Sequence, residues 1–124
     1  MREIKFRGKN TDGDWVFGYF VNSKRITAII DNDDVEYEVD PQTVGQFTGF
    51  KDVDNTDIYK GDIVQNTEHP ELIGKIINEN SCWLVEPLYV FDKVCLVWLL
   101  DNTPQKVIGN VHDNPELLEV KDND

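Results

Sequence analysis

Three aspartates in the loop of residues 51–60 have the spacing that most clearly suggests chemistry: Asp52, Asp54 and Asp57. Carboxylates this close in sequence are the oxygen ligands that a calcium-binding loop supplies. The same residues could instead form a surface for a basic partner. A third possibility is turn chemistry, in which Asp side chains accept hydrogen bonds from nearby backbone N–H groups.

The calcium-loop pattern fails at the positions that matter most. An EF-hand loop that begins at Asp52 would place Asp57 where the sharp turn needs glycine, and Ile63 where a bidentate Glu is needed. We therefore predict no metal site here. Turn chemistry is favoured, with Gly49 and Gly61 adopting backbone angles closed to other residues at the two ends of the loop.

A second acidic cluster places six acids within ten residues: Asp31, Asp33, Asp34, Glu36, Glu38 and Asp40. Such a run is typical of a solvated face that keeps a sheet edge from pairing with other chains. The alternatives are an electronegative patch for a basic host or phage protein, and a mimic of nucleic-acid charge that inhibits a host protein. These six acids, together with Asp52, Asp54 and Asp57, form the predicted interaction surface.

Recognisable catalytic signatures are absent from the sequence. The two histidines, His69 and His112, lie in no nucleophile, zinc or acid–base pattern, and no glycine-rich phosphate loop occurs. We therefore predict no catalytic residues, no cofactor and a protein that is not an enzyme. The alternative is a small metal-dependent hydrolase or nucleic-acid-processing enzyme that uses clustered Asp residues and a divalent ion.

Charge and length restrict the partners and the number of domains. The chain has 124 residues, and its formal charge of −12 comes from 24 acids against 12 bases. A surplus of acids disfavours direct nucleic-acid or membrane-surface binding, because bases must neutralise the phosphates. The length favours one domain over residues 1–124.

The compartment follows from the absence of an export signal. Residues 1–9 lack an apolar segment of signal-peptide length, and the longest apolar run, residues 94–100, is too short to span a bilayer. We expect a protein of the bacterial cytoplasm. Cys82 and Cys95 are then expected to remain thiols and to pack as small core residues.

The pattern of apolar residues predicts mainly β structure. Residues 3–9 and 15–21 favour one hairpin, and residues 25–31 and 35–40 favour a second. Two further strands are predicted around the turn at residues 79–80. Regular strand spacing of this kind is typical of a small barrel or sandwich.

The last third of the chain contains the ambiguous run, residues 89–100, which is apolar on both faces. We predict a strand from about Val94, because Val and Trp dominate the run, and we expect another subunit to cover it. A short helix is predicted at Asn114–Leu118, where Asn suits the N-cap and Pro115 the first helical position.

The three tryptophans stand beside apolar residues in predicted strands: Trp15, Trp83 and Trp98. We predict core or interface positions for them. Base stacking is disfavoured because no Lys or Arg alternates with them along the sequence.

Three stretches of the chain resemble the YopX family, whose members are small proteins found mostly in bacterial phages and prophages. They are residues 1–9 ("MREIKFRGK"), residues 44–64 ("VGQFTGFKDVDNTDIYKGDIV") and residues 107–120 ("VIGNVHDNPELLEV"). The loop departs from relatives, which often carry glycine where this chain has Asn55 or Thr56. An aromatic residue often occupies the position of His112.

The resemblance implies a fold and an assembly, but no reaction. It implies a mainly β fold with a small SH3-like barrel, additional N-terminal hairpins and a short C-terminal helix. It also implies a homo-oligomer, and it brings no established activity. The resulting hypothesis is a phage or prophage accessory protein that works by self-assembly and by contacts with macromolecules.

Overall fold

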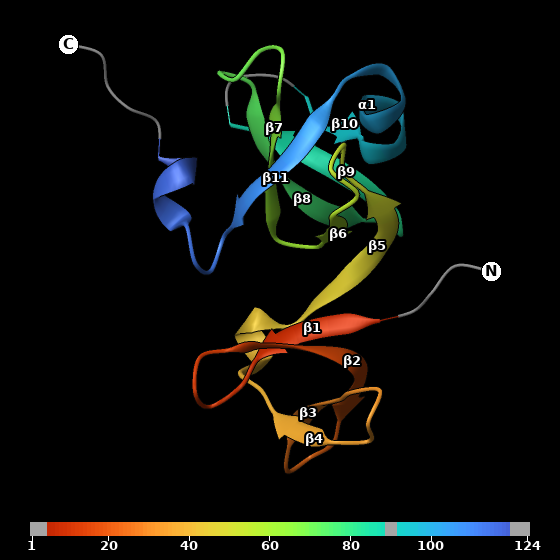
Figure 1. Cartoon of the computed structure of the whole chain (residues 1–124), viewed down its shortest axis with the longest axis vertical. Coiled ribbons are helices and arrows are strands. Elements are labelled where there is room, and N and C mark those ends of the chain that lie inside the picture. Colours follow the sequence, from red (N-terminus) through yellow and green to blue (C-terminus); the bar gives the residue numbers. More distant parts are fainter. Residues whose placement is uncertain (1–4, 89–91, 120–124) are drawn as a thin grey trace. The chain divides into compact units, whose positions relative to one another are not determined.

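The computed structural model describes residues 5–88 and 92–119, and the chain divides into two compact units, Met1–Gly49 and Phe50–Asp124. The strands of the first unit, labelled in Figure 1, are β1 (Phe6–Lys9), β2 (Trp15–Asn22), β3 (Thr27–Ile30), β4 (Glu36–Glu38) and the start of β5 (Gly45–Lys51). The family resemblance and the chain length still predict a single domain.

The first unit confirms both predicted hairpins. Strand β1 pairs antiparallel with β2, β2 pairs with β3, and β3 pairs with β4. Side chains alternate between the two faces of the sheet: Ile29 is fully buried on the face where the ring centroids of Phe6 and Phe20 lie 5.2 Å apart, and Ala28, also fully buried, is on the other face. At Gly18 an added Cβ would lie 2.0 Å from the Ile30 carbonyl oxygen, so this close approach of β2 to β3 requires glycine.

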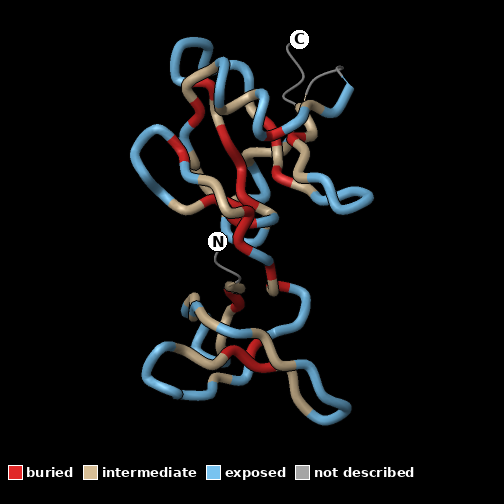
Figure 2. The backbone as a smooth tube through the Cα atoms, turned by 90° about the vertical axis from the view of Figure 1, so that its right-hand side faces the viewer, coloured by how far each residue is buried: buried red, intermediate tan, exposed pale blue. Residues whose placement is uncertain are grey.

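The second unit contains the rest of β5 and an antiparallel five-stranded sheet with the order β10-β9-β8-β7-β11. Its remaining elements are β6 (Asp57–Tyr59), β7 (Asp62–Asn66), β8 (Ile73–Glu79), β9 (Cys82–Pro87), β10 (Val94–Cys95), α1 (Leu96–Asn102), β11 (Gln105–Asn110) and the 3-10 helix η2 (Pro115–Leu118). The core of this unit combines Ile58, Val64, Ile76, Val85 and Leu96. Most buried residues of this unit lie in its strands, and buried residues are red in Figure 2.

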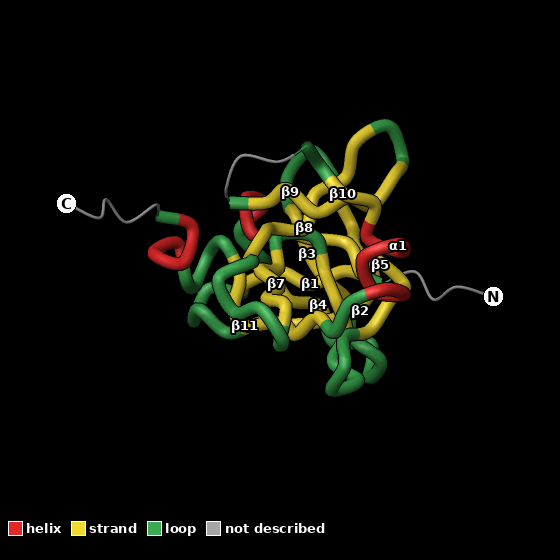
Figure 3. The backbone as a smooth tube through the Cα atoms, turned by 90° about the horizontal axis from the view of Figure 1, so that it is seen from above, coloured by secondary structure: helices red, strands yellow, loops and turns green. Residues whose placement is uncertain are grey.

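The prediction of a mainly β protein is confirmed, as the predominance of strands in Figure 3 shows. A closed barrel is not formed by the described strands. One sheet has the order β4-β3-β2-β1-β5-β6 and the other begins at β10 and ends at β11, so both sheets keep open edges. The predicted C-terminal helix is present as the 3-10 helix η2.

The prediction of a strand from Val94 is correct for the first two residues only and wrong for the rest. Strand β10 ends at Cys95, and the chain continues as helix α1, while residues 89–91 lie outside the described part. Leu96, Leu99 and Leu100 pack on the core at helical spacing. Val97 and Trp98 lie on the exposed side, and their apolar character concealed this helical period in the sequence.

The cysteines are also placed differently from the prediction. Both are free, but both are exposed and neither is a core residue. Cys82 directly follows the tight turn at Asn80 and Ser81, and Cys95 lies on the edge strand β10, where each side chain can face solvent. No helix among the described residues is long and apolar enough to cross a membrane.

Candidate functional site

Three hairpins use the same five-residue turn, and both acidic clusters contain one. The turns begin at Asn10, Asp31 and Asp52. In each, one side-chain oxygen of the first residue accepts hydrogen bonds from the N–H groups two and four positions later, at 2.9–3.0 Å. The fourth residue has positive φ: Gly13 at 83°, Asp34 at 61° and Asn55 at 67°. The predicted turn chemistry of the loop is therefore confirmed.

Asp52 has a second role that the other two turns lack. Its Oδ2 atom accepts a hydrogen bond of 2.9 Å from the backbone N–H of Val107, on strand β11. The residue is 8% exposed, and both of its carboxylate oxygens accept hydrogen bonds from backbone N–H groups. Asp52 thus fastens the loop to the neighbouring strand.

The other two loop aspartates contact separate lysines. Asp54 lies 3.7 Å from the Lys106 ammonium, and Asp57 lies 3.6 Å from that of Lys51. Asp52, Asp54 and Asp57 therefore do not converge on a shared site. Among the described residues, no group of three or more His, Cys, Asp or Glu side chains could hold a metal ion.

The acids of the second cluster divide into turn, cap and surface residues. Asp40 accepts a hydrogen bond from the Gln42 N–H and caps the short 3-10 helix η1 (Pro41–Thr43). Glu36 and Glu38 are exposed on β4, at the edge of its sheet. Asp33 and Asp34 are exposed in the turn that Asp31 organises. The predicted surface therefore consists mainly of Glu36, Glu38 and the exposed turn residues.

A row of aromatic side chains crosses the same unit. Trp15, Phe17 and Tyr19 alternate along β2 and so project to one face of the sheet. Phe17 is 48% exposed and Tyr19 is 66% exposed. Exposed large aromatics in adjacent positions on a small domain are characteristic of a contact surface.

Charged residues flank this aromatic row. Arg7 pairs with Phe17 and Lys9 with Trp15 across β1 and β2, and the cationic groups lie 4.6 and 5.4 Å from the Trp15 ring centre. Strand pairing thus gives Trp15 two basic neighbours, although no Lys or Arg alternates with it along the sequence. On the opposite side, β3 and β4 bring Glu36 and Glu38 to the same face.

Several other titratable groups form isolated surface pairs, whereas the buried Asp62 accepts a hydrogen bond of 2.7 Å from the Tyr59 N–H. His69 is exposed, with its Nδ1 atom 3.7 Å from a carboxylate oxygen of Glu71. Glu79 accepts a hydrogen bond from Lys93, which raises the pKa of that ammonium group. Exposed pairs of this kind contribute little to the free energy of unfolding.

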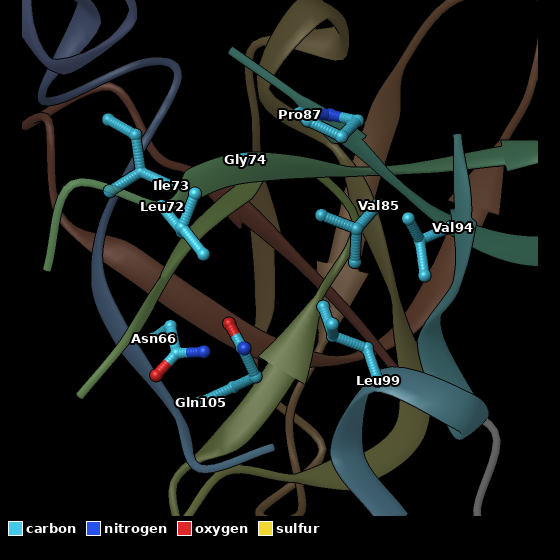
Figure 4. A pocket seen from close by; sticks show the side chains of 9 residues that line it. All are labelled: Asn66, Leu72, Ile73, Gly74, Val85, Pro87, Val94, Leu99 and Gln105. Carbon is cyan, nitrogen blue, oxygen red and sulfur yellow. The ribbon is translucent and has the colours of Figure 1, made fainter. Parts of the chain in front are cut away.

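The second unit also contains a cavity of about 210 Å³. Figure 4 shows its lining, which is aliphatic except for the amide side chains of Asn66 and Gln105. Sequence reasoning missed both residues. Two polar side chains within apolar strands were the available signal, but only the register of β7 and β11 brings them together.

The protein is therefore a mainly β protein with open antiparallel sheets, built largely from hairpins. Its first unit has an aromatic face flanked by charged residues, and its second unit contains the cavity at Asn66 and Gln105. The family model described as "YopX protein" matches residues 5–119, so the chain belongs to the YopX family. No curated protein matches the chain.

Among solved structures, one match is the crystal structure of protein EF1440 from Enterococcus faecalis. The two chains are 24% identical, with a TM-score of 0.65, over 96% of this chain and 100% of that chain. The similarity supports the fold.

Proposed function

We propose that the protein is a non-enzymatic accessory protein of a phage or prophage, which acts in the cytoplasm of the bacterial host by self-assembly and contacts with macromolecules. The observation that carries the proposal is the exposed aromatic row of β2, in which Phe17 and Tyr19 are 48% and 66% exposed. Burying two such side chains against another protein is favourable, because aromatic residues supply large contact areas with little loss of rotamer freedom.

The charges beside the row favour a second copy of this chain as the partner. One flank is basic, with the half-buried Lys9 beside the buried Arg7, and the other is acidic, with the exposed Glu36 and Glu38. A two-fold axis along the aromatic row sets the basic flank of each copy opposite the acidic flank of the other. The charges on this face are therefore complementary to those of a second copy.

Light scattering across a dilution series tests this assembly. We expect a dimer or larger oligomer that dissociates on dilution, and that the variant Tyr19→Glu converts to a monomer at every concentration. Trp98→Glu is the matched control, since Trp98 is also an exposed aromatic, at 57%, but lies in the second unit. A wild-type protein that stays monomeric at high concentration contradicts the proposal, as does equal sensitivity to the two substitutions.

Salt and metal titrations test the remaining parts of the proposal. If the charged flanks contribute, the dimer should weaken as ionic strength rises, because exposed charges are screened. The non-enzymatic role predicts no heat of binding with Mg²⁺, Mn²⁺ or Ca²⁺ at concentrations on the order of millimolar. Uptake of one of these ions, lost on replacing Asp54 and Asp57, would favour the hydrolase instead.

A further inference from the structure

We propose that the cavity of the second unit binds a small uncharged molecule with an apolar body and one amide group, such as a lactam or a carboxamide. Its volume is about 210 Å³. An apolar cavity of roughly 150 Å³ already accepts benzene, so this space is large enough for a single substituted ring. The proposal does not depend on self-assembly, because the aromatic row lies in the other unit.

The lining of the cavity disfavours a charged ligand. Its aliphatic lining includes Leu72, Val85, Val94 and Leu99, and none of the described lining residues is ionisable. A charged ligand would lose its hydration without gaining a countercharge. The body of the ligand is therefore apolar, and its polar group must be met by the two amides.

The orientation of the Gln105 amide is fixed by its neighbours. Its Nε2 atom lies 2.8 Å from the Thr103 hydroxyl oxygen. That hydroxyl donates its proton to the Leu99 carbonyl, so it can only accept from Gln105. The Oε1 atom faces the cavity (Figure 4) and has no partner among the described residues, while the residue as a whole is only 3% exposed.

The orientation of the Asn66 amide is also fixed, but here the oxygen is bound within the protein and the NH₂ group is left over. Its Oδ1 atom accepts hydrogen bonds from the N–H groups of Glu68, at 2.9 Å, and His69, at 3.1 Å. The Nδ2 group is therefore the part that remains for the cavity, and no described residue accepts from it. Asn66 is 5% exposed, so this donor is also inside the protein.

The donor and the acceptor are neighbours. Asn66 and Gln105 are directly opposite each other in the β7–β11 pair, and Figure 4 shows their side chains next to each other. Opposite residues of an antiparallel pair have Cβ atoms roughly 4.5–5.5 Å apart. A lactam or primary carboxamide carries an N–H beside a C=O and can satisfy both groups at once, whereas a ketone satisfies only Asn66.

An NMR titration of the ¹⁵N-labelled full chain tests this site, with ε-caprolactam as the probe and cycloheptanone as the analogue that lacks the N–H. We expect caprolactam to shift amide signals around Asn66, Gly74 and Gln105. We also expect it to bind about ten-fold or more tightly than cycloheptanone, because the ketone leaves the Gln105 oxygen without a donor. Shifts elsewhere only, or no shifts, overturn the proposal.

Variants separate recognition from simple filling of the cavity. Gln105→Met keeps the size of the side chain and should abolish the preference for caprolactam over cycloheptanone. Gln42→Met, at an exposed position of η1, should leave the preference unchanged. If Gln105→Met does not fold, Leu72→Trp at the 46% exposed rim should narrow the entrance and weaken caprolactam binding instead. A Gln105→Met or Leu72→Trp protein that folds and keeps the wild-type affinity and preference refutes the site.

Discussion

The turns at Asp31 and Asp52 are a natural pair for comparison, because the same local structure is used in two different ways. In both, one carboxylate oxygen accepts from the N–H groups two and four residues later. At Asp52 the second oxygen also accepts from Val107, fifty-five positions away. The turn that starts at Asn10 shows that an amide oxygen is enough for the local part. A carboxylate is therefore needed only where both oxygens are used.

The largest effect is expected for Asp52→Ala. The substitution removes the acceptor for three backbone N–H groups, one of them on β11. We expect the free energy of unfolding to fall by about 2–4 kcal/mol, because each lost bond to a charged acceptor costs roughly 1–3 kcal/mol and the two loop donors are partly rehydrated by solvent. Urea denaturation followed by tryptophan fluorescence measures this loss.

Asp52→Asn is the control that separates the two oxygens. The amide oxygen can keep both loop hydrogen bonds, but its NH₂ group then faces the Val107 N–H, so a donor meets a donor. We expect a loss between that of the alanine variant and zero. An asparagine variant as stable as the wild type would show that the bond to β11 contributes nothing, and the comparison would fail.

Asp31→Ala should have a smaller effect, about 1 kcal/mol, because only two hydrogen bonds of an exposed turn are lost. Here the asparagine variant should match the wild type to within about 0.5 kcal/mol, since one amide oxygen can serve both donors, as it does at Asn10. Thermal and urea unfolding of the Ala and Asn variants at both positions completes the test. Equal responses to asparagine at positions 31 and 52 would contradict the distinction.

Local signals were sufficient to predict the hairpins and turns. The alternation of apolar and charged residues predicted β1 to β4, and the Asp-rich segments between strands predicted turns. Both kinds of signal act over a few residues, so sequence order alone contains them. The positive φ values of Gly49 and Gly61, 88° and 91°, were predictable for the same reason.

Features that depend on strand register could not be predicted in this way. The pairing of Asn66 with Gln105, and that of Lys9 with Trp15, joins residues whose neighbourhood is set only after the strands align. Helix α1 was missed for a different reason. Exposed Val97 and Trp98 made both faces of the run apolar, so the helical period of its leucines was hidden.

The smallest effect is expected at the fourth position of these turns. Asp34 and Asn55 are held at φ values of 61° and 67°, which a side chain makes unfavourable and glycine accepts. Asp34→Gly should raise the free energy of unfolding by about 0.5–1 kcal/mol, as the relief of strain exceeds the added chain entropy of glycine. Asn55→Gly should gain less, because Asn tolerates this conformation better than most residues.

Differential scanning calorimetry of the two glycine variants can resolve this gain, with Asp33→Gly as the matched control at an exposed position of the same turn that has no positive φ. The control should lose stability, because glycine there only increases the entropy of the unfolded chain. A loss on Asp34→Gly would contradict the strain argument. In the loop of residues 51–60, Asn55 has the positive φ that suits glycine and Thr56 does not, so position 55 is where glycine would fit the turn. An exchange of Asn55 for glycine is therefore expected to preserve the turn.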